Sequence, residues 1–100
     1  WFLVDTGTAM TMVSREVAEE IGLDLRDPIR LTPIVSVHKV AQAPVVRLNK
    51  LQVGGQGIAG IEALVITLPS ELRLDGLLGV NFLSQFRVTF EFSQSTLVLR

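Results

Sequence analysis

The sequence has no cysteine and a single histidine among its 100 residues. A chain without cysteine forms no disulfide, no thiolate zinc site and no cysteine nucleophile. A metal site that uses several imidazoles would need histidines from a partner chain. We therefore expect no metal site within one chain.

An excess of charge of either sign is also absent, because nine Lys and Arg residues stand against ten Asp and Glu residues, for a net charge of −1. This balance argues against a nucleic-acid partner bound by a basic surface.

The longest stretches without a charged residue, 51–61 and 76–86, have eleven residues each. Both are too short to cross a bilayer, so we expect no membrane segment within these residues.

The residues that are abundant favour one all-β domain over residues 1–100. Apolar residues make up 48% of the chain, which is enough for a packed core. A chain of this length has the size of one small domain. Val, Ile and Thr together number 26, and these residue types favour strands.

The expected elements follow from apolar patterning and turn residues. Ser14 is a good N-cap for a short helix over 15–21, which Gly22 can close. A second short helix is expected near 80–85, after a glycine-containing turn, and a hairpin tip is expected at 41–44. The remaining patterns predict strands at 2–4, 8–13, 31–40, 45–53, 58–68, 88–92 and 96–100.

The chain opens directly on an apolar strand that starts at Trp1, with no partner strand before it. We expect a piece of a longer protein that lacks its N-terminal strand. An anchor or targeting segment upstream of Trp1 would then decide whether the protein is held at a membrane or in the periplasm.

Asp5 is the most informative polar residue. Three apolar residues precede it, and Thr6, Gly7 and Thr8 follow it. A carboxylate at the end of a buried strand is costly unless hydrogen bonds or a partner compensate. Two threonine hydroxyls lie close in sequence, and Gly7 allows the backbone to approach the carboxylate. An ordinary Asx turn would use the same residues, and Asp-Thr-Gly arises by chance in about one such chain in a hundred.

A second motif, LDGLLGVNFL at 74–83, places two apolar residues between glycines and so allows a tight, buried chain crossing. Together with FLVDTGTAMTMVS at 2–14, it resembles the retropepsin-like, or retroviral-type, aspartic proteases, and in particular their bacterial group. The resemblance covers residues 2–23 and about 74–100 and is looser between them.

The resemblance implies an acid-protease fold, a closed β-barrel with one lobe per chain and one or two short helices. Two chains would pair as a homodimer that hydrolyses peptide or protein substrates at a shared site and needs no cofactor. By this match Asp5 would be the catalytic carboxylate, Thr6 would lock the two loops across the dimer axis, and Gly7 would present its N–H to the carboxylate. Thr8 would support Asp5, at a position where relatives carry Ser, Thr or Ala.

The resemblance also assigns a substrate-covering flap to the hairpin over 31–53, with its tip near 37–43. Two features depart from the family pattern. Residues 36–43 contain no glycine, and Asn81 stands where many bacterial relatives carry an acid, so we interpret Asn81 as structural. The flap residues expected to bind substrate are Val37, His38, Lys39 and Val40.

Peptide hydrolysis needs a base for the attacking water and an acid for the carbonyl. One carboxylate cannot supply both, whereas two within hydrogen-bond reach share one proton. Of the four aspartates, only Asp5 follows three apolar residues and has hydroxyls beside it. Asp24 and Asp27 lie in a polar loop, and Asp75 is expected to cap a turn. The second carboxylate must therefore come from another copy of the chain.

Two alternatives stay open. A catalytically silent retropepsin-like module could serve dimerisation or peptide capture, and the glycine-free flap leaves room for this reading. A small β-barrel that binds an apolar ligand would make Asp5 merely structural. Binding of a statine-type inhibitor that requires Asp5 would favour the peptidase, and peptide binding without turnover would favour the silent module.

Overall fold

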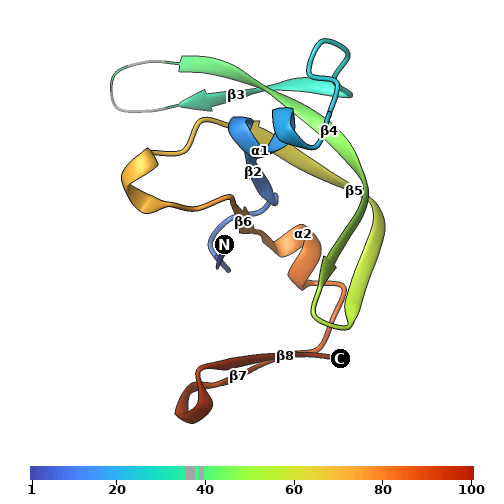
Figure 1. Cartoon of the computed structure of the whole chain (residues 1–100), viewed down its shortest axis with the longest axis vertical. Helices are drawn as coiled ribbons and strands as arrows, with labels where there is room; N and C mark the ends of the chain where they lie inside the picture. Colours follow the sequence, from blue (N-terminus) through green and yellow to red (C-terminus); the bar gives the residue numbers. More distant parts are fainter. Residues whose placement is uncertain (36–37, 39) are drawn as a thin grey trace.

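The computed structural model describes residues 1–35, 38 and 40–100, which form a curved sheet with a separate hairpin below it (Figure 1). The strands are β1 (Phe2–Val4), β2 (Met12–Ser14), β3 (Arg30–Val35), β4 (Val40–Val53), β5 (Gln56–Ile66), β6 (Gly76–Leu78), β7 (Val88–Glu91) and β8 (Thr96–Leu99). The helices are α1 (Arg15–Glu20) and α2 (Val80–Leu83), with 3-10 turns η1 (Ser70–Leu72) and η2 (Phe92–Gln94). The expectation of an all-β fold with two short helices is confirmed, whereas the expected closed barrel is not observed, because the main sheet of the described residues is open at β1 and β3.

The main sheet has the strand order β1-β6-β2-β5-β4-β3. Strand β6 lies between β1 and β2, and it pairs in parallel with β1 and antiparallel with β2. Strand β2 in turn pairs in parallel with β5. Over the described residues β1 and β3 are the two edges, and β7 and β8 pair with each other in a second sheet.

Helix α1 begins where the sequence predicted. The Ser14 hydroxyl accepts a hydrogen bond from the Val17 N–H at 3.1 Å, which satisfies one of the free donors of the first turn. Ala18 is fully buried against the core. Gly22 follows the helix with a φ of +78°, the left-handed conformation that glycine adopts at little cost.

The tip of the β3–β4 hairpin lies earlier than the sequence predicted. Residues 41–44 belong to β4, and the register runs from Arg30↔Val45 to Val35↔Val40. The predicted tip at 41–44 is wrong, because over 40–44 strand β4 pairs with β3 alone, and proline is tolerated in a strand with one free side. The connection between the strands runs through 36–39, of which 36, 37 and 39 lie outside the described residues.

The glycine motif at 74–83 contains strand β6 where the sequence predicted a turn. The expected tight crossing is nevertheless present. A Cβ on Gly76 would collide with the ring of Phe2 and the carbonyl oxygen of Met12. A Cβ on Gly79 would lie 2.5 Å from the carbonyl carbon of Met10. Only glycine therefore allows β6 to pass so close to the segments around it.

The buried apolar residues form two clusters. The smaller cluster joins the β3–β4 hairpin to β2 and the segment before it. Its members are packed against Met10, Met12, Ile34 and Ile66. The two methionines thus serve core packing. The members of the smaller cluster are Ala43, Val45 and Leu64. The members of the larger cluster are Val13, Ala18, Val46, Leu48, Ile61, Ala63, Val65, Leu78, Phe82 and Leu83.

Gly79→Ala should lower the free energy of unfolding by about 1–3 kcal/mol, because the added methyl group overpacks a contact with backbone atoms that cannot move aside. Gly55→Ala is the matched control, since a Cβ there meets nothing within 4 Å. Urea unfolding of both variants measures the difference. Equal stability of the two variants would contradict the close crossing.

Candidate active site

Strand β1 carries Asp5 to the surface of the sheet. The strand is paired with β6 through Val4↔Leu78, and the Asp5 N–H donates to the Leu78 carbonyl oxygen at 3.0 Å. The chain then leaves the sheet and returns to it at Met12. The Asp-Thr-Gly loop is therefore held at one end by the backbone of β6.

The carboxylate of Asp5 is bound by donors from its own loop. The Gly7 N–H donates to Oδ1 at 2.9 Å, and the Thr8 hydroxyl donates to Oδ2 at 2.6 Å. A Cβ on Gly7 would lie only 3.3 Å from Oδ1, so glycine suits the close approach of the backbone. The Thr8 hydroxyl, and after it the Gly7 N–H, hold the pKa of Asp5 below its usual value, with a smaller opposing effect of burial.

The structure thus brings together three of the four loop residues that the sequence singled out. Asp5 and Thr8 are half-buried, and Gly7 is exposed. Thr6 is also exposed in the single chain. A short, charge-assisted bond such as that from Thr8 keeps the carboxylate in one orientation.

Two of the four expected flap residues, His38 and Val40, lie within the part of the chain that the structure describes. His38 is exposed, and Val40 is 66% exposed at the first position of β4. Val37 and Lys39 lie outside the described residues. Among the hydrogen bonds of the described residues, none joins His38 or Val40 to the Asp5 loop.

The interpretation of Asn81 as structural is confirmed. Its Oδ1 accepts from the Thr11 N–H at 2.7 Å and from the Thr11 hydroxyl at 2.8 Å, while its Nδ2 donates to the Glu62 carbonyl oxygen at 2.8 Å. Thr11 is fully buried. The sequence offered one weak signal for Thr11, a lone hydroxyl between two methionines, and gave it no role.

The other aspartates have different surroundings. Asp24 is exposed, and its Oδ1 accepts from the Arg26 N–H at 2.9 Å in a local turn. Asp75 is half-buried, and its backbone carbonyl oxygen accepts from the Ser14 N–H. Asp27 is exposed. Among the described residues, Asp5 is the aspartate whose two carboxylate oxygens both accept from its own loop.

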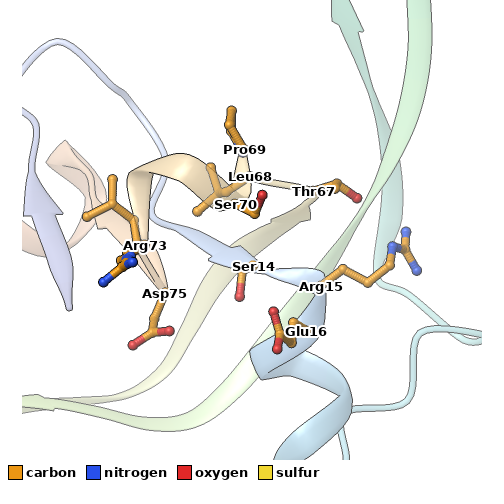
Figure 2. A pocket seen from close by; sticks show the side chains of 10 residues that line it. Ser14, Arg15, Glu16, Thr67, Leu68, Pro69, Ser70, Arg73 and Asp75 are labelled. Atoms are coloured by element: carbon orange, nitrogen blue, oxygen red, sulfur yellow. The ribbon is translucent and has the colours of Figure 1, made fainter.

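A cavity of about 320 Å³ lies where β2 passes into α1 and does not include the Asp5 loop. Figure 2 shows that side chains of both charges reach it, with Arg73 and Asp75 on one side and Arg15 and Glu16 on the other. This mixture favours no single class of ligand. A second hollow of about 330 Å³, lined in part by Ile34, lies under the β3–β4 hairpin.

The described part of the chain holds no group of three or more His, Cys, Asp or Glu residues that could bind a metal ion. None of its helices has both the length and the apolar character needed to cross a membrane.

Comparisons with known proteins agree with this geometry. The family described as aspartyl protease matches residues 1–82. A crystal structure of a retropepsin-like aspartic protease from Rickettsia conorii is similar with a TM-score of 0.74 and 24% identity, over 98% of this chain and 70% of that chain. The retroviral protease-like domain of Ddi1 from Leishmania major is similar with a TM-score of 0.62 and 17% identity, over 96% of this chain and 74% of that chain. The curated proteins contain no match.

The two structural likenesses, at these identities, show the fold. The predicted acid-protease fold of the retropepsin-like type is therefore confirmed. The family match is the finding that concerns the sequence itself, and it includes both the Asp-Thr-Gly loop and the glycine motif before α2. The chain belongs to the aspartyl protease family.

Proposed function

We propose that two copies of this chain pair to form an aspartic endopeptidase, with one Asp5 from each copy at a shared site. The observation that carries the proposal is the Asp5 carboxylate, which is oriented by Gly7 and Thr8 and still reachable at the surface of the loop. Thr6, exposed beside it, would contact the partner loop. A carboxylate fixed in this way is suited to proton transfer.

The two Asp5 carboxyl groups would share one proton, because two carboxyl groups in contact are not both ionised. The ionised Asp5 accepts a proton from a water molecule, whose oxygen attacks the peptide carbonyl carbon. The protonated Asp5 donates its proton to the carbonyl oxygen, which gives a neutral tetrahedral diol. The protonated aspartate then donates to the nitrogen while the ionised one takes a proton from a diol hydroxyl, which breaks the C–N bond and releases an amine and a carboxylic acid. The dyad ends with one proton, as it began.

A second copy is supported by an exposed apolar face beside the loop. On one face of the β7–β8 hairpin, Val88 and Leu99 pack against the chain's own core. The same face continues to Phe90 and Leu97, which line a hollow of about 270 Å³ together with Val4 and Phe92. Because Val4 directly precedes Asp5, a partner that covers this face would approach the catalytic loop.

Two aromatic side chains in this face are unusually exposed. Phe90 is 45% exposed and Phe92 is 87% exposed, and their rings stack with centroids 6.1 Å apart. A two-stranded hairpin is only marginally stable by itself. Burial of this aromatic pair by a second copy would remove the apolar surface from water and stabilise the hairpin.

The β3–β4 hairpin would cover the bound peptide. Its inner face is apolar at Ile34 and Ala43, and both residues line the hollow beneath it. Its outer end carries the exposed His38 and Val40. Side chains of an extended peptide could occupy the apolar hollow while the hairpin excludes water.

Asp5→Asn should reduce peptide cleavage by a factor on the order of 10³ or more, because the amide keeps the size of the side chain but cannot act as a base. Asp24→Asn, at an exposed turn, is the control and should cleave at the wild-type rate. Cleavage of a peptide library, followed by mass spectrometry, measures both. Wild-type cleavage by Asp5→Asn would refute the proposal. Peptide binding without cleavage by the wild type would identify a silent module.

Specific activity should fall on dilution, because one chain holds one catalytic carboxylate. Phe92→Ser should weaken self-association and shift this fall to higher protein concentration. Ile21→Ser is the matched control, since Ile21 is 61% exposed at the end of α1, away from the proposed interface. Sedimentation velocity and activity at several concentrations test the prediction, and constant specific activity from a demonstrated monomer would contradict it.

Thr8→Ala should shift the acid limb of the kcat/KM profile to higher pH. The hydroxyl stabilises the ionised carboxylate, so its loss raises the pKa of Asp5 and, in the dimer, the lower apparent pKa of the coupled pair. The activity that depends on an ionised Asp5 is then lost at a higher pH as the solution is acidified. A limb that stays in place or moves to lower pH would show that the Thr8 bond does not act on the ionised pair.

A further inference from the structure

The segment from Asp5 to Thr11 contains no strand, so no ladder of backbone hydrogen bonds fixes its shape. It is held instead by the start of α2. The Val80 N–H donates to the Thr8 carbonyl oxygen at 2.8 Å, and the Asn81 N–H donates to the Ala9 carbonyl oxygen at 3.0 Å. Thr8 is therefore tied by its backbone to α2 and by its hydroxyl to Asp5.

A buried polar pair continues this attachment. The Thr11 hydroxyl donates to Asn81 Oδ1 and accepts from the Gly79 N–H at 3.1 Å. The Thr11 carbonyl oxygen accepts from the Leu64 N–H at 2.9 Å, and Asn81 Nδ2 donates to β5 at Glu62. Thr11 and Asn81 thus join three parts of the chain: the catalytic loop, α2 and β5.

We propose that Thr11 and Asn81 are positioning residues, which fix the backbone of the loop so that the Thr8 hydroxyl stays in hydrogen-bond contact with Asp5. The reasoning rests on bond length, because a charge-assisted O–H···O bond of 2.6 Å weakens when its donor is displaced or misaligned. Loss of the Thr11 hydroxyl leaves the buried Gly79 N–H without its acceptor and removes one of the two bonds to Asn81. The loop would then relax at its C-terminal end, next to Thr8. The catalytic meaning of this role rests on the proposed peptidase function.

Within the described part of the chain, no charged group on the neighbouring elements forms an ion pair with Asp5 that could mask the effect of the Thr8 hydrogen bond on its pKa. Glu62 of β5 pairs with Arg30, and its Oε2 lies 3.6 Å from Arg47 Nη2. Among the described residues, no ion pair reaches Asp5. Within one chain, the Thr8 and Gly7 donors are therefore the main influences on the pKa of Asp5, and in the proposed dimer the second Asp5 couples to it, so that the pair titrates together.

The test compares Thr11→Val, which removes the hydroxyl at nearly constant volume, with Thr11→Ser, which retains it. The readout is the pKa of Asp5, followed by NMR of its labelled carboxyl carbon, and it does not require catalytic activity. Thr11→Val should raise the pKa of Asp5 by no more than Thr8→Ala does, and Thr11→Ser should leave it close to wild type. In a Thr8→Ala background, Thr11→Val should cause no further shift, because the bond through which it acts is already lost.

Val46→Ala is the control for a general loss of stability, since Val46 is buried in β4 and takes no part in these bonds. The pKa of Asp5 in this variant should be unchanged.

An unchanged Asp5 pKa in folded Thr11→Val would overturn the proposal, as would a full additional shift in the Thr8→Ala background. If Thr11→Val does not fold, Asn81→Ala removes the oxygen that accepts from the Thr11 hydroxyl and N–H, at a half-buried position, and carries the same expectation. A protein without peptidase activity that shows the expected shifts would refute the proposed function and leave the positioning role intact.

Discussion

The hydrogen bonds that the Asp5 loop donates to its own carboxylate are the interaction on which the site depends. A carboxylate at the end of an apolar strand must be compensated, and Gly7 and Thr8 supply that compensation locally. The loop keeps this shape because other parts of the chain approach it closely. Strand β6 receives the Asp5 N–H, and the glycine before α2 allows the start of that helix to touch the loop backbone. The close approach of these segments explains why Gly76 and Gly79 occur in an otherwise packed region.

In the proposed dimer, each chain supplies half of the site. The oriented carboxylate, the exposed Thr6 and the apolar face of the β7–β8 hairpin lie on neighbouring parts of the surface, since Val4 joins the hairpin hollow to the loop. The cavities of the single chain lie elsewhere or under the β3–β4 hairpin, and the described ones do not include Asp5. In our proposal, another copy of the chain supplies the second surface of a cleft around the carboxylate.

Identity of 17–24% with two proteins of the same fold shows how few positions such a fold constrains. The constraints found here are local and physical: a donor beside the carboxylate, space for a crossing strand, and a buried acceptor for Thr11. Polar groups buried in this way are costly when left unpaired. The Thr11–Asn81 pair is accordingly satisfied on every side that the structure describes.

The sequence by itself determined the elements and residues whose signals are local. The strand–Asp-Thr-Gly pattern predicted the loop, and Ser14 and Gly22 predicted the limits of α1. The abundance of Val, Ile and Thr predicted a domain made mostly of strands. The predicted position of the β3–β4 hairpin tip was wrong. Pro44 favours a turn in the sequence, but it lies where β4 pairs with β3 alone, and a strand with one free side tolerates proline. Strand β6 and the role of Thr11 depended on partners about 70 residues away, with Thr11 bound to Asn81 across that separation. Only the tertiary structure could decide them, because a three-residue strand and a lone buried hydroxyl acquire meaning from the groups they pair with and not from their neighbours in sequence.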